Sequence, residues 1–300
     1  MKYLPYDATT LNASLLQKVN EELNESEESK SRCLQQLRER LLDLKDFEPN
    51  LDEEFLLRFL RVAKFNTSKA FTRLQDYHKV QDKYVDFFKN CSLLLAKARK
   101  QRFLWILSQR PQDGSLVLIS EMGKVNHSEL SVEEMAYLPL IIGETLLKNP
   151  STQKCGMSVI VDASGFQYRN VFHYTPKIIR FYFEVVLKAL PIRLASYHVV
   201  NMPSIASSLI NFCLGFVPKK LKNRIFVYPK GGDWSHLHER ISPEILPEHY
   251  GGLLKKSCMV DLLGGDGLIE AENYFRELMR FGSTKTKHKR LAFRLITKNI

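Results

Sequence analysis

The sequence predicts an α/β fold in which an all-helical N-terminal module is followed by a domain with a mostly parallel sheet and crossover helices. Up to about residue 90, apolar residues recur at helical spacing. Over residues 115–229, short apolar strands alternate with helices, which is typical of parallel strands joined by right-handed crossovers. The chain has 300 residues, 44% of them hydrophobic and 26% charged, so it can bury a sizeable core. This composition excludes collagen, a disulfide miniprotein and wholesale disorder.

The helical module begins with residues 11–45, which we expect to be helical. The acidic stretch 21–28 within this region is expected to be solvated and loosely held. After a further helix and a break, Thr67 or Ser68 is expected to cap the next helix. These elements place the module at residues 1–95.

Five short apolar segments are expected to form the sheet of the α/β domain. The helices between them begin at recognisable start signals: Ser131 opens a capping box, and Pro176 follows Thr175 at a first helical turn. We place this domain at residues 96–255, followed by a C-terminal extension with a basic tail at residues 256–300. The expected strands are 103–107, 116–119, 157–162, 197–201 and 225–228.

Charge is distributed unevenly along the chain, whose formal net charge is +11. Residues 1–54 carry a net −6 and residues 276–300 a net +7, so the positive field belongs to the body and the tail. Such a charge favours an anionic partner, namely nucleic acid, an acidic membrane surface or an acidic ligand. No nucleic-acid-binding motif is present, so we expect no nucleic-acid partner.

The sequence contains none of the motifs that would identify an enzyme or a metal centre. GxSxG, GxGxxG, GxxxxGK[ST], HExxH and CxxC patterns are all absent. Asp162 ends an expected strand, where α/β enzymes place catalytic residues, but a capped turn explains it better because no matching base is visible. We therefore expect no catalytic residue, cofactor or metal. Dispersed single cysteines and the lack of a signal peptide predict a cytoplasmic protein.

Residues 194–218 carry no Asp, Glu, Lys or Arg, yet Pro203 and several Ser and Asn residues argue against a membrane span. We expect a strand and then a helix from Pro203 to about Phe216. Such an uncharged helix is either fully buried or a lid whose outer face meets a membrane. Next to it, a run of cations indicates an anionic lipid surface, although a solvated charge run would look the same. These cations are Lys219, Lys220, Lys222 and Arg224.

Four segments resemble the CRAL-TRIO family, in order and with family-like spacing. They are LDEEFLLRFLR at 51–61, VIVDASG at 159–165, HVVNMP at 198–203 and ILPEHYGG at 245–252. The resemblance covers residues 30–260 and is closest to the branch that contains the α-tocopherol transfer protein and the cellular retinaldehyde-binding protein. It implies an N-terminal helical module followed by a CRAL-TRIO α/β domain with a mobile lid helix.

The resemblance also implies a function, that of a cytoplasmic and reversibly membrane-associated carrier for one small hydrophobic lipid. The lipid, such as a tocopherol (vitamin E) or a retinoid, would occupy a closed cavity and would exchange at acidic, phosphoinositide-containing membranes. The alternatives are a lipid-sensing membrane adaptor, a phosphatidylinositol or phospholipid transfer protein, and an enzyme acting on a lipid through Asp162. The implied cavity wall comprises Ala136, Gly143, Met157, Val161, Tyr174, Tyr182, Val185, Leu190, Leu194, Ile205, Leu209 and Phe212.

In the tocopherol branch, a basic cleft binds phosphatidylinositol bisphosphate and promotes ligand release. Two positions here depart from that cleft, because Ala63 (with Lys64 beside it) and Ala195 stand where the branch has basic residues. We expect the additional lysines that follow the lid to compensate. The implied phosphoinositide and membrane contacts are Arg193, Lys219, Lys220, Lys222 and Arg224.

Overall fold

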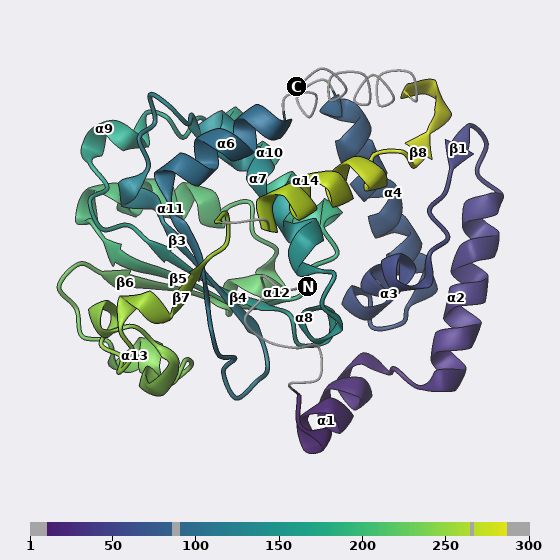
Figure 1. Ribbon diagram of the computed structural model, residues 1–300, viewed down its shortest axis with the longest axis horizontal. Coiled ribbons are helices and arrows are strands. Elements are labelled where there is room, and N and C mark those ends of the chain that lie inside the picture. Colours follow the sequence, from purple (N-terminus) through teal and green to yellow (C-terminus); the bar gives the residue numbers. More distant parts are fainter. Residues whose placement is uncertain (1–10, 86–90, 265–266, 287–300) are drawn as a thin grey trace.

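The structure is a computed structural model that describes residues 11–85, 91–264 and 267–286. Figure 1 shows the N-terminal helices gathered on one side and the sheet with its covering helices on the other. The C-terminal helix α14 (Gly267–Leu278) lies between these two parts. The helical module and the α/β domain expected from the sequence are therefore both present.

In the described part of the helical module there are four main helices rather than the three that the sequence pattern indicated. Residues 11–45, expected to be helical as one region, form two helices because Asn24 adopts the left-handed conformation and Ser26 caps a new helix. The helices are α1 (Ala13–Leu23), α2 (Glu27–Leu42), α3 (Glu53–Val62) and α4 (Thr67–Lys83).

The N-cap of α4 differs from the expectation by one residue. Asn66 caps it, since its side-chain oxygen accepts a hydrogen bond from the Lys69 amide at 3.0 Å, and the expected caps Thr67 and Ser68 lie inside the helix. Asn, Ser and Thr are all good N-caps, so residue type alone does not choose among neighbours.

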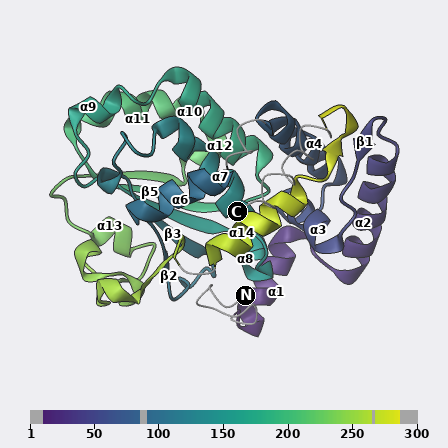
Figure 2. The same ribbon diagram turned by 45° about the horizontal axis from the view of Figure 1, so that its top comes forward.

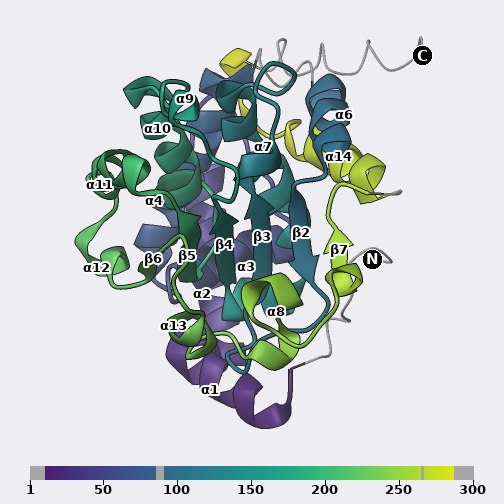
Figure 3. The ribbon, with the colours of Figure 1, turned by 90° about the vertical axis from the view of Figure 1, so that its left-hand side faces the viewer.

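The central sheet has six strands in the order β6-β5-β4-β3-β2-β7, which Figure 3 shows face-on. Strands β3 to β6 run parallel, whereas β2 is antiparallel to both of its neighbours. All five expected strands are present. The sequence analysis missed β7 and the pairing of β1 with β8, because segments of two or three residues are too short to show a periodicity. The strands are β1 (Phe47–Glu48), β2 (Leu104–Leu107), β3 (Leu116–Glu121), β4 (Met157–Asp162), β5 (Leu194–Met202), β6 (Ile225–Pro229), β7 (Met259–Asp261) and β8 (Gly282–Ser283).

The helices of the α/β domain begin largely where the start signals predicted. Ser131 and Glu134 form the capping box of α7 (Val132–Leu146), and Thr175 caps α10 (Pro176–Phe183). The helix expected from Pro203 to Phe216 is shorter and forms in two parts, the 3₁₀ turn η3 (Ser204–Ala206) and α11 (Ser207–Leu214). The other elements are α6 (Cys91–Gln101), η1 (Met122–Lys124), α8 (Pro150–Cys155), α9 (Tyr168–Val171), the π-helical turn η2 (Glu184–Ala189), α12 (Lys219–Lys222), α13 (Ser235–His238), η4 (Pro243–Ile245), η5 (Glu248–Tyr250), η6 (Lys256–Cys258) and η7 (Thr284–Thr286).

The two faces of the sheet are covered by different layers. Figure 2 shows α7, α10 and α11 on one face and α13 on the other. Side chains alternate along β4, so Met157, Val159 and Val161 point to the α7 side. Ile160, from the opposite face, joins a second hydrophobic cluster with the 237–250 region. Met157, Val159 and Val161 border a cavity on the α7 side.

A buried polar cluster joins the helical module, the α/β domain and the C-terminal extension. Arg58 of α3 pairs with Glu144 of α7 (Nη1–Oε2 2.5 Å) and donates to the hydroxyl of Tyr274 in α14. Both charged side chains are nearly inaccessible to solvent, at 3% and 0% exposure. Because removing either charge would leave the other buried and unpaired, this contact fixes α3 and α14 against α7.

Two remaining expectations concern the membrane and the basic tail. Of the helices in the described ranges, none has the length and apolar character needed to cross a bilayer. The basic tail beginning at Lys285 lies, from residue 287 onward, outside the described residues.

Candidate functional site

A cavity of about 700 Å³ lies between the α7 side of the sheet and the helices that cover it. Its lining is mainly aliphatic and aromatic and comes from β3–β6, α7, α10, η2 and α11. This volume lies within the range of about 300–1,000 Å³ that is usual for small-molecule sites. The cavity is therefore large enough for one small lipid.

Most of the residues implied as the cavity wall line this cavity. Among them, Gly143 keeps space open on α7, because a Cβ atom there would lie 3.1 Å from Ile192 Cδ1 and 3.2 Å from Leu190 Cδ1. The lining set comprises Ala136, Gly143, Met157, Val161, Tyr174, Tyr182, Leu190, Leu194 and Leu209.

The other three residues of the implied wall lie elsewhere or are not described. Val185 is fully buried in the core and is not part of the cavity lining. Phe212 is 43% exposed, with its ring 5.3 Å from that of Phe216, and also lies off the lining. The side chain of Ile205 falls outside the described residues. Helical spacing groups residues by face but does not say which face looks inward, so Phe212 was assigned to the wrong side of α11.

Polar groups inside the cavity are mainly neutral phenols. Burial raises the pKa of Tyr174, Tyr182 and Tyr197, so all three keep their hydroxyl protons at neutral pH. The sequence analysis missed Tyr197, although its place on β5, two residues before Val199, was a usable signal. These hydroxyls can hydrogen-bond a neutral polar group on an otherwise apolar ligand.

The segment 204–214, formed by η3 and α11, is called the lid here. No residue of α11 is buried, although Leu209, Ile210, Cys213 and Leu214 border the cavity. The sequence left open whether this uncharged helix is fully buried or a lid. In the structure its outer face is exposed, so it is not fully buried. Phe172, which follows the neighbouring α9, is 79% exposed.

One end of the cavity carries a group of cations, called the basic rim: Lys64, Arg193, Lys220 and Arg224. Arg193 pairs with Glu22 of α1 (Nη2–Oε1 2.6 Å), and Lys64 pairs with the same carboxylate oxygen at 3.2 Å. Burial alone would raise the pKa of Glu22, but Arg193 and Lys64 hold it below its ordinary value. Glu22 is therefore an anion that stands among the cations of the rim.

The two other implied membrane contacts, Lys219 and Lys222, lie on the surface beside the rim. Both are exposed on the short helix α12 and do not border the cavity. Lys64, which follows Ala63 at the end of α3, reaches the rim from a left-handed backbone conformation (φ 52°). A left-handed turn at a lysine is not visible as a pattern in the sequence, so the position of Lys64 at the rim could not be predicted from it.

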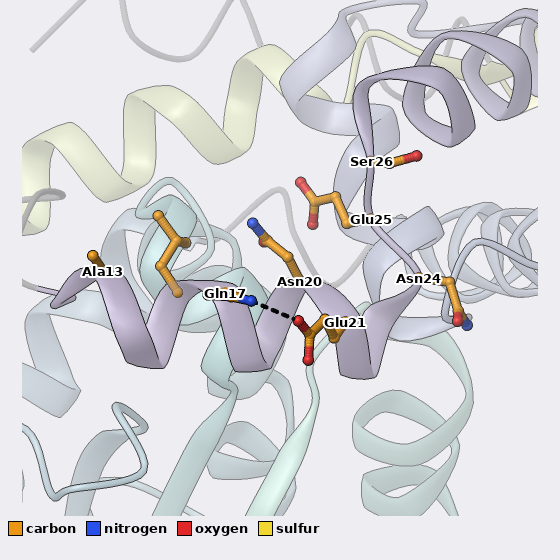
Figure 4. A pocket seen from close by; sticks show the side chains of 8 residues that line it. Ala13, Gln17, Asn20, Glu21, Asn24, Glu25 and Ser26 are labelled. Atoms are coloured by element: carbon orange, nitrogen blue, oxygen red, sulfur yellow. Dashed lines mark hydrogen bonds between the residues drawn. The ribbon is translucent and has the colours of Figure 1, made fainter.

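The acidic stretch 21–28 is only partly solvated, contrary to the expectation. Glu25 is 8% exposed and pairs with Arg61 at 2.8 Å and Lys154 at 3.2 Å. By contrast, Glu21 accepts a hydrogen bond only from Gln17 among the described residues, at 2.9 Å (Figure 4). The hollow drawn in Figure 4 is an open groove along α1 rather than an enclosed cavity.

Asp162 performs the structural role expected of it. Its carboxylate accepts hydrogen bonds from the Ser164 amide (2.8 Å), the Asn201 side chain (2.9 Å) and the Tyr250 hydroxyl (3.0 Å). Burial would raise the pKa of Asp162, and these donors lower it. Asp162 thus ties the ends of β4 and β5 to the segment that closes the domain. Within the described ranges, no three His, Cys, Asp or Glu side chains come together as a metal site would require.

Comparison with known proteins gives matches along most of the chain. Residues 100–252 match the CRAL/TRIO domain, and residues 14–76 match the CRAL/TRIO N-terminal domain. Clavesin-1 of Xenopus laevis is 29% identical over 248 residues, which are 81% of this chain and 74% of that protein. Human clavesin-2 is 28% identical over 81% of this chain and 75% of its own. The solved structure titled "Crystal structure of Sfh5" aligns with a TM-score of 0.43 and 14% identity over 67% of this chain and 71% of that one.

Proposed function

The chain belongs to the CRAL-TRIO family of lipid-binding proteins, and on this premise we propose that it carries one small hydrophobic lipid and exchanges it at acidic membranes. The observation that carries the proposal is an apolar cavity of about 700 Å³ with a basic rim at one end. Apolar burial would hold the ligand, at about 25 cal/mol per Å² of apolar surface removed from water. The rim would meet the membrane.

The cavity favours a ligand that is apolar along most of its length and has one neutral polar group. Aliphatic side chains dominate the lining, and Tyr174, Tyr182 and Tyr197 offer protonated hydroxyls. An ionised ligand group would leave water for a mainly apolar lining, which is costly. A tocopherol or a retinoid has the required chemistry, and we propose this ligand class.

Exchange would take place when the lid enters the interface of an acidic membrane. The basic rim would bind lipid headgroups, each cation contributing about 1 kcal/mol. The outer face of the lid, with Phe212, and the nearby Phe172 would then leave water for the acyl boundary. The open state gains population only because the membrane binds it better than the closed state. The protein would thus be cytoplasmic and reversibly bound to membranes.

Recognition of phosphoinositides would use the basic rim together with Lys219 and Lys222. Ala63 stands where the tocopherol branch has a basic residue. Lys64, the next residue, lies at the rim and would supply the missing positive charge. A multiply charged headgroup suits several convergent cations better than a single one. Phosphatidylinositol bisphosphate is therefore the headgroup that we propose.

The test is a charge reversal of two rim residues, Lys220→Glu with Arg224→Glu. Loss of two cations predicts at least about 30-fold weaker binding to vesicles containing phosphatidylserine and phosphatidylinositol bisphosphate, and slower lipid transfer. Ligand loading should be unchanged, because apolar contacts hold the lipid. Lys45→Glu with Lys100→Glu adds two negative charges in place of two cations at exposed positions that do not border the cavity, and serves as the control. Equal transfer by both double variants would contradict the mechanism.

Identification of the ligand requires organic extraction of the natively purified protein and mass spectrometry. A stoichiometric prenol or retinoid would support the proposed ligand class. A phospholipid would indicate a phospholipid-transfer role instead. A protein that is empty and takes up no lipid from vesicles would contradict the carrier function.

A further inference from the structure

The acidic end of α1 lies against cations of the α/β domain. α1 packs on α8, and the apolar side chains Val19 and Leu23 are buried with Cys155 beneath it. Two carboxylates lie at this end of the helix, Glu22 in its last turn and Glu25 just after it, and each pairs with two cations. This arrangement places negative charge where the proposed function needs an anionic headgroup.

The two carboxylates differ in how firmly they are held. Glu25 is 8% exposed, and both of its oxygens accept hydrogen bonds from Arg61, at 2.8 to 3.2 Å. Glu22 is 47% exposed and meets Arg193 and Lys64 through a single oxygen. Glu25 therefore anchors the turn after α1, whereas the contact of Glu22 is open to water and exchangeable.

We infer that Glu22 is an internal competitor for the phosphate headgroup at the basic rim. The inference rests on the proposed function, because it concerns the same rim. Arg193 and Lys64 cannot give their full hydrogen-bonding capacity to a phosphate while the Glu22 carboxylate occupies them. A phosphomonoester carries about −1.5 to −2 charges against −1 for the carboxylate, so it displaces Glu22 rather than joining it.

Competition has a reciprocal consequence for α1. If headgroup binding weakens the Glu22 contact, then holding that contact must weaken headgroup binding by the same factor. Headgroup binding should therefore loosen the C-terminal turn of α1, while Glu25 keeps the following turn in place. In the ligand-loaded protein away from membranes, Glu22 neutralises part of the rim and lowers its attraction for other anions.

The experiment compares Glu22→Gln with Glu21→Gln in the full chain. Both remove one negative charge from α1, but Glu21 contacts Gln17 and no cation among the described residues. We expect Glu22→Gln to bind vesicles of phosphatidylcholine with phosphatidylinositol bisphosphate about fivefold more tightly than wild type, which corresponds to about 1 kcal/mol. Glu21→Gln should change binding by less than twofold, about the effect of a screened surface charge. Equal affinities for the two variants would overturn the inference.

A second measurement follows α1 directly by amide hydrogen exchange. Soluble inositol trisphosphate should speed exchange in the last turn of α1 in wild type, and phosphatidylinositol bisphosphate vesicles should do the same. An effect of the vesicles alone would assign the competition to the membrane rather than to the phosphates. No change with either probe would overturn the inference.

Failure of this inference and failure of the proposed function give different results. If the Lys220→Glu, Arg224→Glu protein loses vesicle binding while Glu22→Gln behaves as Glu21→Gln, the rim binds headgroups and Glu22 does not compete. If neither the rim variant nor Glu22→Gln changes vesicle binding, the proposed function fails together with the inference.

Discussion

Two helices that line the cavity, α7 and α11, have similar apolar character and very different environments. Twelve of the 15 residues of α7 are buried, whereas none of the eight residues of α11 is. α7 lies between the sheet, the helical module and α14, so it is packed on more than one side. α11 meets the cavity on one side and solvent on the other. One wall is thus part of the core and the other covers the cavity.

The contrast indicates where the molecule can open. Segments with little buried apolar surface separate from the rest at low free-energy cost, whereas core helices open only with global unfolding. An exposed helix ordinarily carries charged residues, yet α11 has none. Its exposed apolar face is unfavourable in water and would be favourable in a lipid interface. The predictions below test this difference between the two walls.

The largest expected effect comes from the same substitution placed on each helix, Leu140→Gln on α7 and Leu209→Gln on α11. Leu140 is fully buried, so the glutamine would lose its apolar contacts and bury an amide, at a cost of about 3–5 kcal/mol. Leu209 is half-buried, so its substitution should cost about 1 kcal/mol or less. Denaturant unfolding of the ligand-free proteins measures both values. Similar losses would show that the lid is packed as firmly as α7.

Acid should lower the free energy of unfolding through groups in the core rather than in the lid helix. α11 contains no Asp, Glu, His, Lys or Arg, whereas the sheet contains a buried histidine. His198 of β5 is fully buried between the Tyr228 hydroxyl (2.9 Å) and the Ser196 hydroxyl (2.8 Å). Burial, and secondarily Arg240, lowers its pKa from 6.5 to about 4. The unfolded chain therefore takes up the proton first, and as the pH falls from about 6.5 to 4 the free energy of unfolding decreases by at most about 3 kcal/mol.

The measurement is unfolding as a function of pH for wild type, His198→Asn and His236→Asn. Carboxylates titrate over the same range, but they do so in all three proteins. His236 is exposed, so its variant controls for replacing a histidine at the surface. A His198→Asn protein with the wild-type slope between pH 6.5 and 4 would contradict the assignment.

Filling the cavity, with Gly143→Leu on α7, should change stability less than the substitutions at Leu140 and His198 do. The new side chain would point toward the ends of Leu190 and Ile192, which must shift, at a cost of about 1–2 kcal/mol. Ligand loading should fall strongly, because the leucine would occupy ligand space. Extraction and mass spectrometry measure the loading. Gln35→Leu on the exposed face of α2 adds the same side chain elsewhere and should load normally; full loading of Gly143→Leu would place the ligand away from α7.

The fold was predictable where local interactions decide it. The capping box at Ser131, the Thr175 cap and the strand ending at Asp162 all appear as expected. The two-residue strand β1 could not be predicted, since its partner β8 lies more than 230 residues away in the chain. Most of the implied cavity residues line the cavity, while Val185 and Phe212 do not. Residue spacing places a side chain on a face, and only packing decides what that face meets.

The acidic N-terminal stretch shows the same limit for charge. The pattern around Glu22 and Glu25 was expected to be solvated, because acidic runs on a helix usually are. Their cation partners are Arg61, Lys64, Lys154 and Arg193, which are separated from them by 36 to 171 residues. A sequence contains no direct signal for a pairing over such a distance.

The residues alone establish which segments can form helices and strands, that residues 194–218 are uncharged, and that cations follow them. These are properties of residues that are close together in the sequence, so they do not depend on how the chain folds. Tertiary structure decides that α7 is buried while α11 is exposed, and that Glu22 stands among the cations of the basic rim. The physical reason is that burial and ion pairing depend on distances between elements, and those distances exist only after the sheet, the helical module and α14 have packed together.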